Sequence, residues 1–482
     1  MFDQAKGFVS ARLLEHLAEA IENGNEKDLS TLFRTISMLA PSRYHRAGFE
    51  KMSRMAEENH PFVGVFKRTF QQLHPNVRKK FIANFLVNFV VLGRGIRDRE
   101  ERSRNRHLPN FLVISPTMRC NLRCKGCYAS GYGNEAELSF GELDRILTEA
   151  KSLGMYFFTF SGGESFLRND LLDLWAKHGD CFFQVYTNGT LLDDALVDKL
   201  VGLGNVAPMV SIEGGPDSTD SRRGVGMHEK IMGTFSRMKR AGLLYGFSAT
   251  YTRKNAEEIT DEGFIDGMIS AGCLAGWFFQ YIPTGQKPDA TLMATPRQRA
   301  LLHERVEQWR KSKPIFMGDF WNDGPYVDGC MAAGERYLHI IANGDVEPCV
   351  FVHFAVDNIH GKALADVLES PFFKAIREKQ PYEDDNLLCP CLVIDHPHVL
   401  REIVGETNAH PTHPGAESIL GELAPDLDRY SKEMKRIFDP IWEKSGREKY
   451  LRSLENEDKP EVHARVGRKR TGGSPTIPQP KR

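Results

Sequence analysis

Three cysteines stand close together in the segment Arg119–Tyr128 (RCNLRCKGCY) of this 482-residue chain. Cys120, Cys124 and Cys127 form a C-x3-C-x2-C run. Iron-sulfur clusters are held by cysteine thiolates, and this spacing lets one loop supply three corners of a 4Fe-4S cube. Three ligands leave one iron open, and an open iron can chelate a small molecule and pass it one electron. A structural zinc site is the alternative, but zinc normally takes four closed protein ligands.

A second group of cysteines lies nearer the C-terminus, at Cys330, Cys349, Cys389 and Cys391. The pair Asn343-Gly344, a strong hairpin signal, stands between the first two and folds the chain back so that their thiols approach each other. Such thiols indicate metal ligands, redox groups or buried thiols and not a disulfide framework, and a zinc site at these four positions is one alternative. Cys181 and Cys273 lie in apolar segments typical of buried thiols.

The first cysteine group directly follows a short apolar run, and from there such runs alternate with amphipathic helices. The expected buried strands are residues 111–115, 156–160, 182–187, 206–212, 244–251 and 276–282. A helix is expected between the first two strands, with Ser139 as its N-cap and Gly154 as its stop. The alternation is typical of right-handed β-α units with a parallel sheet. It predicts an α/β fold, a partial (β/α)6 TIM-like barrel, because a full barrel needs eight strands.

The remaining regions are expected to flank this barrel, which spans residues 106–314. Residues 1–105 place apolar side chains at helical spacing and predict a helical N-terminal domain. Residues 315–400 predict a C-terminal α+β auxiliary domain around the second cysteine group, and 401–457 predict further helices. Residues 458–482 have the Pro, Gly and charge content of a disordered basic tail.

These features resemble the radical S-adenosylmethionine superfamily, whose defining motif is C-x3-C-x2-C after the first strand of a partial β/α barrel. Cys120, Cys124 and Cys127 match that motif position for position, and the resemblance extends over residues 111 to about 395. It implies that a reduced 4Fe-4S cluster donates an electron to bound S-adenosylmethionine and breaks its S–C5′ bond. The 5′-deoxyadenosyl radical then abstracts hydrogen from an unactivated C–H bond. An electron donor such as flavodoxin or ferredoxin is implied as a partner.

The same resemblance implies where S-adenosylmethionine binds. The implied contacts are Tyr128, Ser161, Gly162, Gly163, Glu164, Thr187, Asn188, Ser211 and Arg223. The backbone of the Gly-Gly-Glu segment would bind the amino group of the methionine moiety, because glycine permits close approach. Ser211 and Arg223 would meet its carboxylate. A plain turn is the alternative for Asn188 and a solvated surface charge the alternative for Arg223, while Glu213 stands where the family usually has Asp.

The spacing of Cys330, Gly344 and Cys349 resembles the C-x(9–15)-G-x4-C signature of SPASM and twitch extensions, which carry auxiliary 4Fe-4S clusters. A full SPASM domain would supply further C-x2-C pairs, whereas only Cys389 and Cys391 remain. One second 4Fe-4S cluster, as in a twitch domain, is therefore expected. The sequence leaves open whether both of the last two cysteines bind it.

The substrate is less defined than the chemistry. Peptide or protein modification is the commonest role of relatives with such an extension, although the helical N-terminal region is unlike the winged peptide-recognition module often fused to them. Residues 78–99 place basic side chains on both sides of an apolar run, a layout compatible with an anionic membrane surface. This indicates C–C coupling of lipid acyl groups as another hypothesis, while a buried helix docked on the barrel is the favoured explanation of the run. A non-catalytic iron-sulfur sensor or assembly protein is the alternative to an enzyme.

Composition narrows the setting. The net charge is −1, with 63 basic and 64 acidic side chains, so no general field attracts nucleic acid. The first residues lack the apolar core of a secretory signal, and the run from Phe81 to Leu92 is far shorter than the roughly 20 residues of a spanning helix. We expect a cytoplasmic protein, with peripheral membrane contact through residues 78–99 as an additional hypothesis.

Overall fold

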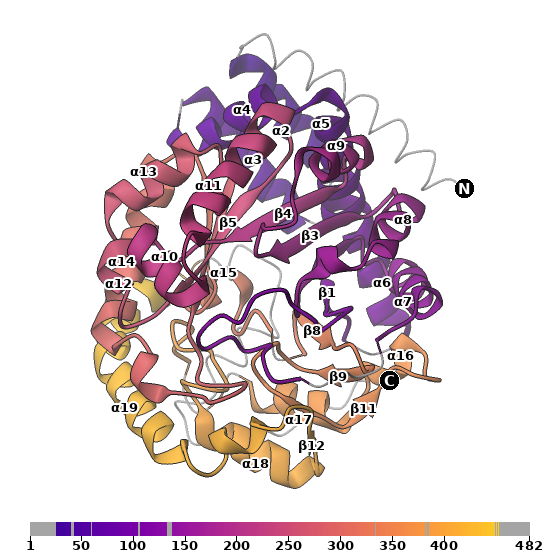
Figure 1. Cartoon of the computed structure of the whole chain (residues 1–482). Coiled ribbons are helices and arrows are strands. Elements are labelled where there is room, and N and C mark those ends of the chain that lie inside the picture. Colours follow the sequence, from indigo (N-terminus) through magenta and orange to yellow (C-terminus); the bar gives the residue numbers. More distant parts are fainter. Residues whose placement is uncertain are drawn as a thin grey trace.

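The computed structural model describes residues 26–39, 43–58, 60–104, 107–132, 137–332, 334–380, 382, 385–448, 450 and 452. The predicted tail over residues 458–482 lies outside these ranges. Within them, no helix combines the length and apolarity needed to cross a membrane. Figure 1 shows N-terminal helices at one end of a central sheet and the C-terminal elements at the other.

The described N-terminal residues are helical. The elements are α2 (Glu26–Leu39), α3 (Arg43–Glu57), α4 (Pro61–Gln72), α5 (Pro75–Lys80), the π-helix η1 (Phe81–Gly93) and α6 (Arg94–Arg104). The apolar run lies in η1 and packs on the barrel: the Phe85 ring lies 5.8 Å from that of Phe157 and 5.4 Å from that of Phe182. Asn84 donates to two backbone carbonyls in the loop that precedes the third strand. This run therefore docks on the sheet, and the structure lends no support to the predicted membrane contact.

The six predicted strands are confirmed, and a seventh follows them. They are β1 (Phe111–Ile114), β2 (Phe157–Phe160), β3 (Phe182–Thr187), β4 (Val206–Ser211), β5 (Gly246–Tyr251), β6 (Ala275–Gln280) and β7 (Phe316–Asp319). Each pairs in parallel with the next, so their carboxyl ends meet at one edge. The partial TIM-like α/β barrel is confirmed.

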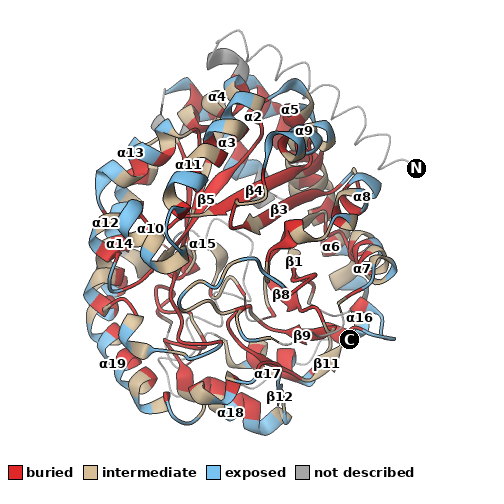
Figure 2. Ribbon diagram, in the orientation of Figure 1, coloured by how far each residue is buried: buried red, intermediate tan, exposed pale blue. Residues whose placement is uncertain are grey.

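The connecting helices cover the outside of this sheet, whose strands are mostly buried (Figure 2). They are α7 (Phe140–Ser152), η2 (Ser165–Leu167), α8 (Asp170–Lys177), α9 (Asp194–Leu203), α10 (Pro216–Arg223), α11 (Met227–Ala241), α12 (Ala256–Ile259), α13 (Glu262–Ser270), η3 (Ala290–Leu292) and α14 (Pro296–Ser312). The predicted N-cap is confirmed: Ser139 Oγ accepts from the Glu142 backbone N–H at 3.2 Å, and the Glu142 side chain reciprocates.

The C-terminal region is joined to the same sheet. Its elements are α15 (Gly324–Val327), β8 (Tyr337–Ile340), β9 (Asp345–Glu347), β10 (Phe354–Ala355), β11 (Asp357–Asn358), α16 (Leu364–Val367), α17 (Pro371–Lys379), α18 (Pro397–Thr407), β12 (His410–Pro411), η4 (Ala416–Ile419), α19 (Ala424–Ile441) and η5 (Trp442–Gly446). The predicted hairpin joins β8 to β9, with Gly344 at φ 87°. Because β8 pairs in parallel with β1, the described sheet has ten strands and runs across the boundary predicted near residue 315.

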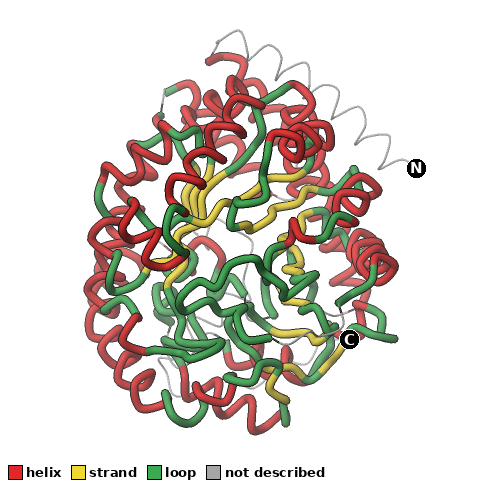
Figure 3. Tube along the Cα trace, viewed as in Figure 1, coloured by secondary structure: helices red, strands yellow, loops and turns green. Residues whose placement is uncertain are grey.

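Loops gather where the carboxyl ends of the strands face the C-terminal region (Figure 3). Behind them lie two large apolar cores, one between the sheet and its helices and one within the C-terminal region. The loops are thus held between two packed bodies, which positions the side chains that they carry.

Candidate functional site

A cavity of about 1070 Å³ opens at the carboxyl ends of the strands. It is lined by Cys120, Cys124, Cys127, Tyr128, Ser161, Gly162, Gly163, Glu164, Thr187, Asn188, Ser211 and Arg223. The structure therefore brings together every residue predicted for the first cluster and for the S-adenosylmethionine site.

The loop that carries the three cysteines is fastened at both ends. Asn188 at the end of β3 donates its side-chain amide to Asn121 Oδ1 at 2.8 Å and lies 3.7 Å from Cys120 Sγ. On the far side, Arg222 of α10 donates to the Lys125 carbonyl at 3.1 Å, and the Lys125 N–H donates back to the Arg222 carbonyl. Asn188 therefore holds the cysteine loop, which goes beyond the plain turn that was its alternative.

The two glycines after β2 are required by the same loop. A Cβ on Gly163 would lie 2.0 Å from the Arg119 carbonyl oxygen, a backbone atom that cannot move aside. Gly162 has φ 96°, and a Cβ there would meet Ser115 and the Thr117 carbonyl at about 2.7 Å. Glycine is needed because the end of β2 presses directly against the segment that leads into the cysteines.

Glu164 does not point a free carboxylate into the cavity. Its side chain is fully buried and accepts hydrogen bonds from the Thr187 hydroxyl at 2.9 Å, the Asn188 N–H at 2.8 Å and the Phe166 N–H at 3.2 Å. Burial raises the pKa of Glu164 despite these donors. Glu164 and Thr187 thus tie the end of β2 to the end of β3.

Glu213 forms ion pairs with both Arg222 and Arg223. Its buried carboxylate accepts from Arg222 Nη1 at 2.6 Å, from Arg223 Nε at 2.9 Å and from the Thr250 N–H at 2.9 Å. Burial by itself would raise the pKa of Glu213, but the two guanidinium groups outweigh it and lower the pKa. Arg223 also lies 3.9 Å from Cys124 Sγ, so it is a buried part of the cluster surroundings and not a solvated surface charge.

Tyr128, directly after the third cysteine, connects the cysteine loop to the glycine turn. Its hydroxyl lies 2.6 Å from Ser161 Oγ and accepts a longer hydrogen bond, 3.4 Å, from the Gly162 N–H. Burial raises the pKa of Tyr128 to about 12. The phenol therefore stays protonated and keeps its donor.

A buried polar network around Glu347 was not predicted from the sequence. Glu347 at the end of β9 accepts from His339 Nδ1 at 2.7 Å, and its other oxygen lies 3.4 Å from His353 Nδ1. His339 Nε2 in turn contacts Ser115 Oγ at 2.6 Å, and Tyr132 OH lies 2.9 Å from His353 Nδ1. These residues are far apart in sequence, so no local pattern signals that they meet.

The second cysteine group is divided by the structure. Cys330, Cys349 and Cys391 line one small apolar cavity, which Phe320 and Phe351 separate from the main cavity. The Cys389 thiol is absent from that lining and instead lies near Arg299 and Tyr430. Three of the four predicted ligands therefore line one cavity, and Cys389 lies outside it.

The cysteines that line the two cavities have surroundings suited to iron-sulfur clusters. Backbone N–H groups two residues farther along donate to the sulfurs of Cys120, Cys127, Cys330, Cys349 and Cys391. Such N–H···S bonds stabilise thiolate charge and tune cluster potentials.

The number of ligands bears on the zinc alternative. A structural zinc site takes four protein ligands, normally cysteine or histidine. The lining of each cavity holds three cysteines and no histidine. Each trio therefore matches a cluster with one open iron better than a closed zinc site.

Comparison with known proteins identifies both halves of this arrangement. The Radical SAM superfamily profile matches residues 114–261, and an iron-sulfur cluster-binding domain, SPASM, matches residues 330–392. The AdoMet-dependent heme synthase of Methanosarcina barkeri is 24% identical over 312 residues, which cover 58% of this chain and 88% of that protein. The sporulation killing factor maturation protein SkfB of Bacillus subtilis is 25% identical over 54% of this chain and 65% of its own length.

A solved structure shows the same fold. Streptococcus suis SuiB, in its complex with precursor peptide SuiA, aligns with a TM-score of 0.50 and 20% identity over 58% of this chain and 70% of that one. Both family models match, and one cavity holds all residues predicted for the first cluster and for S-adenosylmethionine. These findings favour an enzyme over the non-catalytic alternative. Residues 114–261 therefore form a Radical SAM domain and residues 330–392 a SPASM domain, and the protein is a radical S-adenosylmethionine enzyme whose cofactors are S-adenosylmethionine, a 4Fe-4S cluster and a further iron-sulfur cluster.

Proposed function

We propose that this enzyme abstracts hydrogen from an unactivated C–H bond of an apolar molecule that carries carboxylates, bound in the same cavity as S-adenosylmethionine. The cluster on Cys120, Cys124 and Cys127 supplies the electron that cleaves S-adenosylmethionine. The observation that carries the substrate proposal is the lining of the 1070 Å³ cavity, which joins an aromatic wall to a basic rim. A cavity at the upper end of the usual range for small-molecule sites leaves room for two ligands.

An aromatic wall forms part of the cavity lining. It is formed by Phe111, Phe157, Tyr186, Trp277, Phe279, Phe320 and Tyr337. Aromatic faces bind flat or apolar groups and exclude water from the reacting bond. Exclusion of water matters here because a carbon-centred reaction has to be protected from competing side reactions.

The rim is basic. Arg123, Lys125 and Lys287 line the cavity, are exposed, and make no ion pair with any described residue. The acidic residues in the lining are Glu164, whose carboxylate is buried and hydrogen-bonded, and Asp289. This charge imbalance favours a ligand with carboxylates beyond the one that S-adenosylmethionine brings. Heme, the product named for the Methanosarcina relative, is an apolar ring with carboxylate arms.

Peptide modification and the coupling of lipid acyl groups remain the competing substrate classes. The complex of SuiB with precursor peptide SuiA supports peptides as ligands of related proteins. The lipid hypothesis has lost its main support, because the apolar run in η1 packs on the barrel.

We further propose that the auxiliary cluster is bound by Cys330, Cys349 and Cys391, without Cys389. The three thiols share one cavity next to the main one, and Tyr337 OH, which lines the main cavity, lies 3.6 Å from Cys349 Sγ. This neighbourhood suits electron exchange between the auxiliary site and a substrate in the main cavity.

The reaction is tested by anaerobic reconstitution, reduction with dithionite and measurement of 5′-deoxyadenosine. Three deuterated candidates are compared: a tetrapyrrole with carboxylate arms, an acidic peptide and a long fatty acid. Deuterium should appear in 5′-deoxyadenosine with the tetrapyrrole. Transfer from the peptide or the fatty acid only would overturn the substrate proposal, and no 5′-deoxyadenosine from protein with loaded clusters would overturn the reaction itself.

The rim is tested by charge reversal. Lys287→Glu should raise the KM for the carboxylate substrate about fivefold, the effect of one exposed charge contact. Lys254→Glu, an exposed lysine outside the cavity lining, is the matched control and should leave KM unchanged. Equal KM values for the two variants would show that the rim does not contact substrate.

The auxiliary ligand set is tested by iron counting and electron paramagnetic resonance of the reduced protein. Cys389→Ala should keep the full iron content and both cluster signals, whereas Cys391→Ala should lose the auxiliary signal. Loss of that signal in Cys389→Ala would place the fourth cysteine among the ligands.

A further inference from the structure

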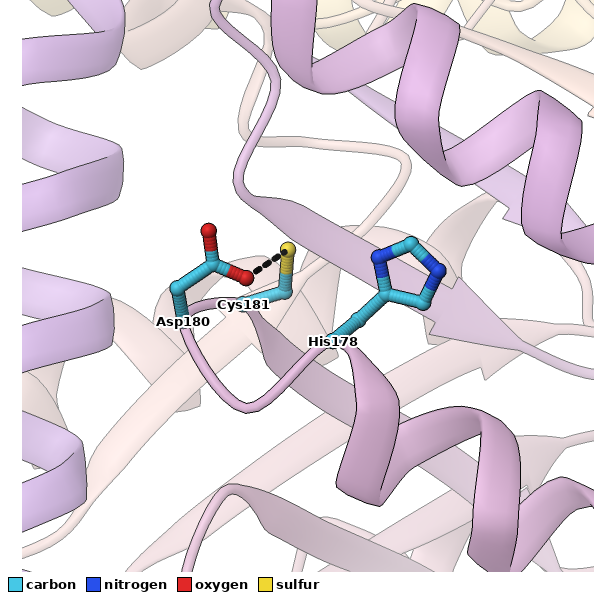
Figure 4. A group of neighbouring side chains, drawn as sticks. All are labelled: His178, Asp180 and Cys181. Atoms are coloured by element: carbon cyan, nitrogen blue, oxygen red, sulfur yellow. Dashed lines mark hydrogen bonds between the residues drawn. The ribbon is translucent and has the colours of Figure 1, made fainter.

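A second group of metal-ligating side chains lies at the opposite end of the barrel. His178, Asp180 and Cys181 occupy the loop between α8 and β3, and one ligand atom from each lies within 4.8 Å of the others. Figure 4 shows the three side chains drawn together, with the ring nitrogen of His178 nearest its Cγ turned toward the Cys181 sulfur. Six residues of β3, roughly 20 Å, separate this loop from the main cavity.

The hydrogen bonding of His178 leaves one ring nitrogen available to bind a metal ion. It is 2% exposed, and its Nε2 lies 3.0 Å from Asp144 Oδ1. Because a carboxylate only accepts, Nε2 carries the proton and Nδ1 keeps its lone pair. That Nδ1 is buried and has no hydrogen-bond partner in the described part of the protein. A carboxylate on the far nitrogen is the arrangement that usually orients metal-bound histidines.

The other two ligands complete a soft, mixed donor set. Cys181 Sγ is fully buried and lies 3.7 Å from Asp180 Oδ1, close to the separation of about 3.5 Å that sulfur and oxygen adopt on one zinc ion. The Asp180 side chain is half exposed, so an ion can enter from solvent and keep a water molecule as its fourth ligand. Imidazole, thiolate and carboxylate together favour zinc among the common divalent cations.

The loop is held in place from the N-terminal helices. Asn84 donates to the carbonyls of Gly179 and Cys181 at 3.1 and 2.8 Å, and Lys80 donates to Gly179 at 2.7 Å. Asn88 donates to the Asp180 carbonyl at 2.8 Å. Backbone fixed in this way presents the ligands with little reorganisation, which favours binding.

We propose that His178 Nδ1, Cys181 Sγ and Asp180 bind a zinc ion that fixes the loop between α8 and β3. The ion displaces the thiol proton of Cys181, which is released to solvent as the Zn–S bond forms. It also competes with Lys151, whose Nζ lies 3.2 and 3.3 Å from the two Asp180 carboxylate oxygens. This site is separate from both iron-sulfur sites and needs neither of them.

The test uses the full-length protein with its clusters reconstituted, so that cluster cysteines are already occupied by iron. The protein is mixed with one equivalent of zinc chloride, passed over a chelating resin and analysed for zinc and iron. About one zinc ion per protein molecule should remain in the wild type, and less than about a tenth in Cys181→Ala and His178→Gln. Cys273→Ala, which removes another fully buried thiol, is the matched control and should keep its zinc.

Two further measurements separate a built site from a loss of folding. X-ray absorption at the zinc edge of the wild type should show one sulfur at about 2.3 Å and nitrogen or oxygen neighbours at about 2.0 Å. Lys151→Ala should tighten zinc binding about two- to fivefold in a chelator competition, because it removes an ion pair from Asp180. No retained zinc in the wild type, equal zinc in Cys181→Ala, or a zinc spectrum with only sulfur neighbours would overturn the proposal.

Discussion

Replacing Glu347 by glutamine should destabilise the protein by roughly 3 kcal/mol. The fully buried carboxylate faces His339 and His353. Burial would raise its pKa, but the hydrogen bonds from the two histidines lower it to about 2, against an ordinary value of 4.5. At about 1.4 kcal/mol per pKa unit, this difference corresponds to roughly 3 kcal/mol near neutral pH. Removing one partner of a buried charged pair costs about 3–5 kcal/mol, which agrees.

The assay is anaerobic thermal unfolding of the holoprotein at pH 7.5. For a cooperative unit of 150–250 residues, roughly 3 kcal/mol lowers Tm by about 6–12 °C. Asp194→Asn is the control, because its ion pair with Arg240 is exposed on both sides and should change Tm by less than about 3 °C. Equal Tm values for the two variants would refute the stabilising role of the buried network.

The sign of the pH dependence follows from the direction of the shift. Since the pKa of Glu347 is lower in the folded protein than in the unfolded state, its stabilisation is fully present above pH 4.5 and is lost as pH falls toward 2. Acid unfolding of the full-length protein should therefore be steeper in the wild type than in Glu347→Gln. A steeper acid-unfolding transition in Glu347→Gln than in the wild type would contradict the lowered pKa of Glu347.

Two further changes test the main cavity. Tyr128→Phe removes the hydroxyl that contacts Ser161, and the loss of about 0.5–1.5 kcal/mol should weaken S-adenosylmethionine binding about two- to tenfold in equilibrium dialysis; unchanged affinity would separate this contact from the cofactor. Gly163→Ala brings a Cβ against the Arg119 carbonyl, so the cysteine loop has to shift and 5′-deoxyadenosine release should fall at least about tenfold. Gly202→Ala, with no atom near its added Cβ, is the control, and equal rates in both glycine variants would show that the loop tolerates the shift.

Short-range patterns in the sequence predicted much of the fold. The strands β1 to β6, the Ser139 capping box and the hairpin at Gly344 all depend on residues within a few positions of one another. The cysteine loop was also predictable, because its three thiols lie within eight residues of sequence. Strand β7, which pairs with β6, was missed. Strand β8 was predicted only as half of a hairpin, because its pairing with β1 joins residues more than 200 positions apart.

The sequence by itself determined which chemistry is available to this protein: three thiols on one loop after a strand, two glycines after the next strand, and a second cysteine group. Only the tertiary structure decided how those residues are used. It turned Cys389 away from Cys330, Cys349 and Cys391, and it set Glu213 between two arginines. The physical reason is that burial, hydrogen-bond partners and charge pairing depend on which distant segments pack together, and a motif carries no information about them.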